Sequence, residues 1–161
     1  MGPTRSNPGP TVTPADTRLC LDVMLGGLVS PLRMIGYDTA YTLERGIEDD
    51  EAILELAERE DRLVLSRDRA VASAADPGLL LTETDPLEQL RELAEAGFEL
   101  ELTEPMRCSR CNGTLDRVTD GPGPEDGPAP GDEPVWECRS CGQFYWTGSH
   151  WENLEKRLGR L

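Results

Sequence analysis

Four cysteines in two CxxC pairs are the residues whose spacing most clearly predicts chemistry. Cys108 and Cys111 form the first pair, CSRC, and Cys138 and Cys141 form the second, CRSC. Four thiolates at this spacing are typical of a tetrahedral zinc site that is structural, because no coordination position stays open. Two disulfides are the alternative. Since the chain shows no signal peptide, we expect a cytoplasmic protein, where disulfides are rare. The pattern therefore predicts one structural Zn²⁺ ion.

The stretch between the two cysteine pairs is unusually long and polar. Residues 112–137 separate the pairs, more than the roughly 15–20 residues typical of this pattern. Within it, residues 119–134 read TDGPGPEDGPAPGDEP, a Gly-, Pro- and acid-rich composition that cannot form a core. We therefore expect a disordered tip on a zinc-ribbon hairpin. Cys20 stands apart in an apolar run and is expected to be a small buried hydrophobic side chain.

Acidic residues form the second candidate site. Asp22 and Asp68 follow segments that resemble strands, and Asp49, Asp50 and Asp85 stand at predicted helix starts. In a parallel sheet, ligands bind beyond the carboxyl ends of the strands, so these carboxylates would share one rim. A Mg²⁺ or Mn²⁺ ion accepts such oxygen ligands and can activate water against a phosphodiester. The alternative is that several of these acids only cap helices, and spacing alone leaves both interpretations open.

The elements that must position these acids alternate along the chain. Short apolar segments predict strands over 18–21, 38–42, 63–65 and 78–81. Apolar residues at helical spacing predict helices over 25–35, from 49 or 50 through 57, over 69–75, and after Asp85, where Pro86 and Glu88 complete a helix start. Alternation of strands and helices predicts an α/β sandwich with a mainly parallel sheet.

The composition limits the partners that the chain can attract. The net charge is −15, and Lys156 is the single lysine. An acidic, lysine-poor surface resembles proteins of halophilic archaea, and an ordinary acidic protein is the alternative. Because this charge repels nucleic acid, any contact with RNA must be local. No apolar stretch is long enough to span a bilayer, so we expect no membrane partner.

Four segments together resemble one known family. They are LDVMLGGLVSPLRMIGYDT, DDEAILELAEREDRLVLSRD, MRCSRCNGTL and WECRSCGQFYWTGSHW, and they resemble the Mut-seven C-terminal RNase domain family over about residues 19–154. The resemblance implies a PIN-like three-layer α/β sandwich followed by a zinc ribbon. It also implies a metal-dependent RNase site in which Asp22, Asp50 and Asp68 hold Mg²⁺ or Mn²⁺, with Asp49 as an alternative second acid. Ser66 stands where the family usually has threonine.

These observations divide the chain into three parts. We expect a disordered tail over 1–17, a PIN-like nuclease domain over 18–104, and a zinc ribbon with a short terminal helix over 105–161. Four further residues are candidates for RNA contacts, each with a structural alternative. Arg33 could hold a phosphate or pair with an acid, and Arg67 could do the same or be solvated. Trp146 could stack on a base or pack the ribbon, and His150 could contact phosphate or help to cap the terminal helix.

The sequence as a whole favours a metal-dependent endoribonuclease that hydrolyses RNA through the aspartates, with the ribbon aiding RNA binding. A non-catalytic RNA- or ribosome-binding protein is the alternative, and a toxin of a toxin–antitoxin pair is a third, disfavoured by the ribbon. Protein partners stay unknown. Geometry discriminates between the first two, because the carboxyl oxygens of three metal ligands should lie within about 4–7 Å of a common point.

Overall fold

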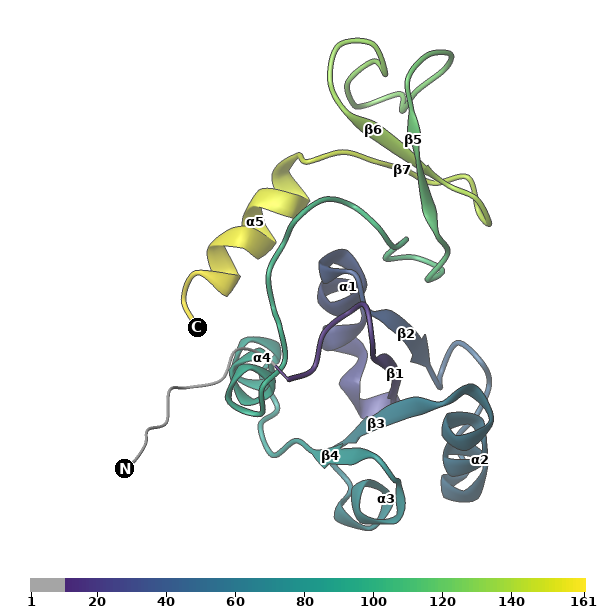
Figure 1. Cartoon of the computed structure of the whole chain (residues 1–161), viewed down its shortest axis with the longest axis vertical. Coiled ribbons are helices and arrows are strands. Elements are labelled where there is room, and N and C mark those ends of the chain that lie inside the picture. Colours follow the sequence, from purple (N-terminus) through teal and green to yellow (C-terminus); the bar gives the residue numbers. More distant parts are fainter. Residues whose placement is uncertain (1–10) are drawn as a thin grey trace.

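A four-stranded parallel sheet forms the centre of the computed structural model, which describes residues 11–161 (Figure 1). Its strands are β1 (Arg18–Leu21), β2 (Asp38–Tyr41), β3 (Arg62–Ser66) and β4 (Gly78–Leu80). They lie in the order β2-β1-β3-β4, and every neighbouring pair is parallel. The predicted α/β class with a mainly parallel sheet is confirmed. β1 is central, so the residue that follows it lies in the middle of one rim.

Helices cover both faces of this sheet and make three layers. The helices are α1 (Gly26–Ile35), α2 (Asp50–Glu60), α3 (Arg69–Ala74) and α4 (Pro86–Glu95), and a short 3-10 turn, η1 (Val23–Leu25), precedes α1. Leu19 and Leu21 of β1 pack in one cluster with α1 and α4, whereas Cys20 packs in another with α2 and α3. This follows from the alternation of side chains along a strand. Cys20 is fully buried, as predicted.

Local signals in the sequence set the ends of these helices. Gly36 ends α1 with φ 120°, in the left-handed region that favours glycine. Asp49 caps α2 and accepts a hydrogen bond from the Ala52 amide at 3.3 Å. Asp85 caps α4 in the same way, and Pro86 fills the first helical position. Each helix from α1 to α4 follows a strand of the parallel sheet, so the N-termini of these four helices face the carboxyl rim of the sheet.

Residues before the predicted boundary at residue 18 also belong to the α/β domain. Residues 1–10 of the predicted tail lie outside the described residues, but Val12 is bound into the domain. Its amide donates to the Gly97 carbonyl at 3.0 Å, and its carbonyl accepts from the Glu99 amide at 2.8 Å. The Val12 side chain packs on the α1–α4 cluster. Residues 11–17 therefore extend the α/β domain.

A smaller antiparallel sheet forms the ribbon beyond α1 and β2 (Figure 1). Its strands are β5 (Leu115–Val118), β6 (Val135–Cys138) and β7 (Phe144–Tyr145). The loop 119–134 joins β5 to β6, and we predicted it to be disordered. In the structure Pro130 is buried, and the backbone of Gly127 lies so close to the Trp146 ring that a Cβ would sit 2.8 Å from it. The loop thus packs against the ribbon at these points.

The terminal helix α5 (Ser149–Leu158) returns from the ribbon to the α/β domain. Trp151 and Leu154 are buried, and Leu158 packs against the α1–α4 cluster. Arg91 of α4 donates to the carbonyl of Arg160 at 3.1 Å. The ribbon is therefore attached to the α/β domain at both of its ends. Within residues 11–161, no helix is both long and apolar enough to cross a membrane.

Candidate functional site

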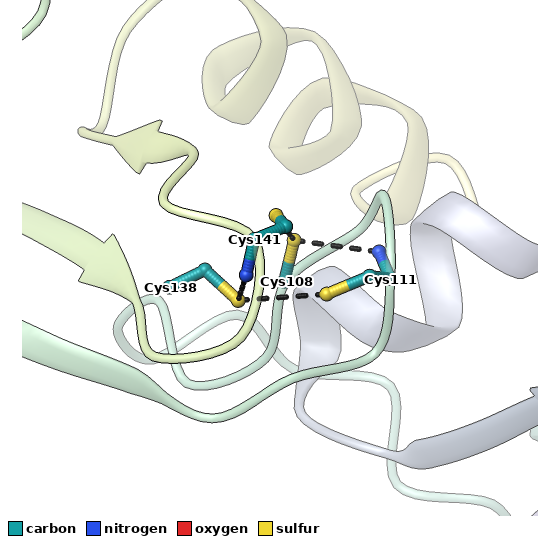
Figure 2. Close-up of side chains that lie close together, drawn as sticks. All are labelled: Cys108, Cys111, Cys138 and Cys141. Atoms are coloured by element: carbon teal, nitrogen blue, oxygen red, sulfur yellow. Dashed lines mark hydrogen bonds between the residues drawn. The ribbon is translucent and has the colours of Figure 1, made fainter.

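The four cysteines of the two CxxC pairs converge at the base of the ribbon (Figure 2). Their sulfur atoms all lie within 4.8 Å of one another, with 3.6 Å between Cys108 and Cys141 and 3.5 Å between Cys111 and Cys138. A tetrahedron of sulfurs about 2.3 Å from zinc has edges of about 3.8 Å, whereas a disulfide joins sulfurs at about 2.05 Å. The spacing fits a shared metal ion and excludes disulfides in this arrangement.

Burial and hydrogen bonds act differently on the thiols of this cluster. Burial raises the pKa of the Cys108 thiol, but bonds with the Tyr145 hydroxyl at 2.9 Å and with backbone N–H groups outweigh it and lower the pKa to about 7. Burial raises the pKa of Cys111 to about 12, and its sulfur neighbours reinforce this shift. Four thiolates so close together repel one another unless a cation neutralises them. The donor set and its spacing fit Zn²⁺, which favours four sulfur ligands.

Gly113 shows how closely the chain wraps the cluster. A Cβ at this position would lie 2.7 Å from the Cys138 sulfur and 3.2 Å from the Cys111 sulfur. We call the turn that carries Cys108 and Cys111 the first knuckle, and the turn that carries Cys138 and Cys141 the second knuckle. Only glycine at position 113 therefore allows the first knuckle to close over the second. Asn112 precedes it with φ 73°, which asparagine tolerates better than most residues. Both residues belong to the CNG sequence that begins at Cys111.

Asn112 also fastens the ribbon to the edge strand β2. Its side-chain oxygen accepts from the Thr39 amide at 2.9 Å, and its amide nitrogen donates to Asp38 at 2.7 Å. Arg62 donates to the same Asp38 carboxylate at 2.9 Å. Burial opposes ionisation of Asp38, but the bonds from Asn112 and Arg62 prevail and lower the pKa of its carboxyl. A metal knuckle and a sheet edge thus share one polar junction.

Arg33 belongs to this junction, and the structure does not place it at the acidic rim. Only 1% of Arg33 is exposed, and its guanidinium makes five hydrogen bonds. Two reach the Thr39 carbonyl, two reach the Glu44 carboxylate, and one reaches the Ser109 carbonyl in the first knuckle. All of its donors are occupied, so none is left for a phosphate. Its ion-pair partner is Glu44, at 2.7 Å, and not one of the rim aspartates.

Asp22 and Asp68 meet at the carboxyl rim through one serine. Asp22 directly follows the central strand and is 5% exposed. Its carboxylate accepts from the Val23 amide at 2.7 Å and from the Ser66 hydroxyl at 2.8 Å. The same hydroxyl accepts from the backbone amide of Asp68 at 2.9 Å. The third strand therefore delivers a buried hydroxyl that fixes one aspartate and the backbone of the other.

The acids predicted to hold a metal do not converge on one point, and two of them cap helices. One oxygen of the Asp68 carboxylate caps α3 by accepting from Ala70 and Val71, and Asp49 caps α2. Asp50 is the first residue of α2 and is exposed. Among residues 11–161, the four cysteines are the one set of three or more Cys, His, Asp or Glu side chains close enough to hold an ion. Asp22, Asp50 and Asp68 do not form such a set.

The three other residues predicted to contact RNA do not all lie together. Arg67 is exposed beside Asp68 on the rim. Trp146 is half-buried next to Gly127, and His150 is exposed in the first turn of α5, where Gly148 takes the cap position. Trp146 and His150 both line a groove between α1, the ribbon and α5, whereas Arg33 and Arg67 do not.

Several important residues have no equivalent in the sequence-based predictions. The sequence predicts no role for Asn112 at the junction or for the cations Arg110, Lys156, Arg157 and Arg160 along the groove. Tyr145 belongs to a cluster of aromatic residues expected to stack on bases or pack the ribbon, but its contact with the metal cluster is not foreseen. The cations left a visible signal, because three of them fall within the last six residues of an acidic chain. Asn112 left a weaker one, as the residue that follows the first cysteine pair.

The chain matches one known family over nearly its whole length. The match is to the Mut7-C RNAse domain and covers residues 17–158, from the start of β1 to the end of α5. It includes the rim aspartates, the four cysteines and all of the groove lining except Arg160. No significant match exists among curated proteins or among solved structures. Because the family match spans most of the sequence, this chain belongs to the Mut7-C RNAse domain family.

Proposed function

We propose that this protein is a metal-dependent ribonuclease whose site is the carboxyl rim around Asp22. The observation that carries the proposal is the link from Asp22 through Ser66 to Asp68. A carboxylate that is 5% exposed, at the end of the central strand and oriented by a buried hydroxyl, is an unusual arrangement for a solvated surface acid. Membership of an RNase domain family supports the same assignment and makes RNA the expected substrate.

Each rim residue would have its own role. Asp22, Asp68 and Asp50 would hold Mg²⁺ or Mn²⁺, and Asp49 is the alternative to Asp50. A bound ion of this kind supplies an activated water and stabilises negative charge on the attacked phosphate. Ser66 keeps the Asp22 carboxylate pointed at the rim and fixes the Asp68 backbone. A PIN-like sandwich, as the family resemblance implies, is the fold that we propose for this arrangement.

Assembly of the site requires one local change. Asp68 would have to turn at least part of its carboxylate away from the Ala70 and Val71 amides toward the ion. The exchange is feasible, because a carboxylate has about four lone-pair positions and can cap a helix while coordinating a cation. Asp50 is exposed and makes no hydrogen bond through its side chain within the described residues, so it is free to reorient.

A non-catalytic RNA-binding protein is the second candidate function. It is favoured by the absence, within residues 11–161, of any carboxylate set close enough to hold an ion, and by the helix-capping bonds of Asp49 and Asp68. In that case Ser66 and Asp22 would only close the carboxyl ends of β1 and β3. The two candidates make opposite predictions about cleavage.

The test is RNA cleavage by the purified protein with Mn²⁺ or Mg²⁺ at high KCl, beside Asp22→Asn and Asp68→Asn. We expect both variants to lose cleavage while zinc content and helical circular dichroism stay unchanged. Asp85→Asn is the matched control, because it alters a helix-capping aspartate on α4 and should keep full cleavage. Ser66→Thr should keep activity and Ser66→Ala should reduce it. Absence of cleavage by the wild type, or equal cleavage by both aspartate variants, would favour the binding protein.

A further inference from the structure

A groove with a volume of about 1170 Å³ runs between α1, the ribbon and α5. Gly27, Ser30 and Met34 of α1 line one wall. The ribbon contributes the first knuckle and β7, and α5 contributes the opposite wall. Figure 1 shows how these elements are arranged, with α5 running from the ribbon toward α4 on one side of α1. The lining includes none of the four cysteines and none of the rim aspartates.

The charge of this groove is opposite to that of the protein. Its 22 lining residues include five with permanent positive charge, which are Arg107, Arg110, Lys156, Arg157 and Arg160, together with His150. They include no Asp or Glu, although the chain's overall frequency of acids (31 in 161) would place about four in a set of this size. A groove without acids in a chain with a net charge of −15 is a local attraction site for an anion.

Most of these cations are free to bind a ligand. Within residues 11–161, Arg110, Lys156, Arg157 and Arg160 take part in no ion pair, and only Arg107 has a carboxylate partner, Asp38 at 3.6 Å. Arg110 donates one hydrogen bond, to the Gln143 side-chain oxygen at 3.3 Å. Arg33 and Arg62 differ, because they donate to carbonyl and carboxylate oxygens inside the fold. Arg110 comes from the first knuckle, Lys156 and Arg157 from the last turn of α5, and Arg160 from just beyond α5, so these cations approach the groove from two sides.

The remaining lining suits unpaired bases. Phe144 and Trp146 are half-buried in the ribbon wall, with part of each ring still accessible. Aromatic faces stack on bases that are not paired, and a combination of such faces with a positive groove is typical of single-strand binding. Ser30 and Asn153 add hydrogen-bonding groups that contact phosphate or sugar without selecting a sequence.

One end of the groove reaches the rim that carries Asp22. Gly26 lies at the start of α1 beside the Tyr41 hydroxyl, with 3.0 Å from a Cβ built on Gly26 to that oxygen. The Tyr41 hydroxyl in turn donates to the carbonyl of Val23, the residue after Asp22, at 2.7 Å. A strand lying along α1 would therefore leave the groove at the rim.

We propose that this groove binds single-stranded RNA, with phosphates on the free cations and bases against the ribbon aromatics, and leads the strand toward Asp22. The direction toward Asp22 rests on the proposed ribonuclease function, whereas the binding does not. Four free cations that each meet one phosphate predict a salt dependence of log K against log[salt] with a slope of about −3, since each contact contributes about −0.7 on a single strand.

The experiment is fluorescence anisotropy with a labelled single-stranded RNA of mixed sequence, titrated over a range of KCl concentrations. All proteins carry Asp22→Asn, so that the RNA stays intact. We expect Lys156→Gln/Arg157→Gln/Arg160→Gln to weaken binding by about tenfold or more at low salt and to reduce the slope by about 2. Arg110→Gln changes a different element and should reduce the slope by about 0.7, which keeps the test valid if the helix variant is unstable.

Arg59→Gln is the matched control, because Arg59 is an exposed arginine at the far end of α2 with no ion pair among the described residues. It removes the same charge outside the groove and should leave affinity and slope unchanged. Equal losses in Arg59→Gln and Arg110→Gln, or full displacement of RNA by polyglutamate at equal charge, would overturn the proposal. Binding at the groove without cleavage by the wild type would refute the ribonuclease and leave the groove proposal standing.

Discussion

The α/β domain and the ribbon are stabilised by different forces. The α/β domain buries two hydrophobic clusters, of 13 and 6 side chains, on the two faces of its sheet. The ribbon has one cluster of four buried residues, and two of these are the cysteines Cys108 and Cys138. We therefore expect burial of apolar surface to be sufficient for the first region, and the second to need a metal bound by its four cysteines. Two modes of stabilisation therefore coexist in one short chain.

Metal removal should have the largest effect, because it should destabilise the ribbon and leave the α/β domain folded. Structural zinc contributes an apparent 10–16 kcal/mol, roughly, to small metal-dependent folds. We expect a chelator, or Cys138→Ser, to unfold the ribbon while most of the helical circular dichroism from α1 to α4 persists. All three tryptophans lie in residues 136–151, so tryptophan fluorescence reports the ribbon and α5 selectively.

The control for this prediction is Cys20→Ala, which removes a buried thiol outside the metal cluster. It should lower the stability of the α/β domain slightly and leave one zinc ion per chain. A ribbon whose tryptophan fluorescence survives complete zinc removal would show that its small core is sufficient after all.

A truncation in the larger core should have the reverse effect. Leu90 of α4 is completely buried in the α1–α4 cluster. Leu90→Ala should lower the free energy of unfolding by about 2–5 kcal/mol through lost burial and a cavity, and zinc content should not change. Leu43→Ala, at a residue that is 55% exposed, should stay within about 0.5 kcal/mol of the wild type. Loss of zinc from Leu90→Ala would contradict the independence of the two regions.

The junction between the two regions should show a smaller effect that spreads to both. Asn112→Ala removes the bonds to Thr39 and Asp38 and leaves the Thr39 amide unpaired. We expect a loss of about 1–3 kcal/mol. Hydrogen exchange should accelerate in β2 as well as in the first knuckle. Asn153→Ala, at an exposed residue of α5, is a control that should leave hydrogen exchange in β2 unaltered.

Acid should weaken the α/β domain by the smallest amount. Bonds from Arg45 and Arg62 lower the pKa of Glu60 to about 2. Because the folded pKa is below the unfolded value of about 4.3, the contribution is complete above that pH and is lost as pH falls toward 2. Solvent screening limits it to about 1 kcal/mol. The wild type should therefore be more stable than Glu60→Gln at pH 5, and this difference in unfolding free energy should fall by about 1 kcal/mol, the full contribution, as the pH is lowered to 2. A constant difference would show that the pair is not coupled to folding.

Sequence patterns predicted the local features of this fold well. The glycine at position 36, the acid–proline start at Asp85 and Pro86, and the two CxxC pairs each act through neighbours in the chain. Strand β1 and the order of strands and helices followed from the same short-range signals. The alternating burial of Leu19, Cys20 and Leu21 is a direct consequence of strand geometry.

Long-range pairings account for what the sequence did not predict. Arg33 looked available for phosphate because its partner Ser109 is 76 residues away, in a knuckle whose position no local pattern indicates. Residues 11–17 have no periodicity, and they are ordered only because Val12 pairs with the segment after α4. The groove cations belong to elements brought together by the return of α5. Whether Asp22, Asp50 and Asp68 hold a metal stays a prediction.

The edge strand β2 gives the junction a role in solubility. Both backbone groups of Thr39 that face away from the sheet are occupied by side chains, the amide by Asn112 and the carbonyl by Arg33. A strand edge with free donors and acceptors invites pairing with another copy of the chain. The folded knuckle conceals that edge. A metal ion that keeps the knuckle folded would therefore also keep this strand edge covered, and we expect metal removal to promote self-association through β2.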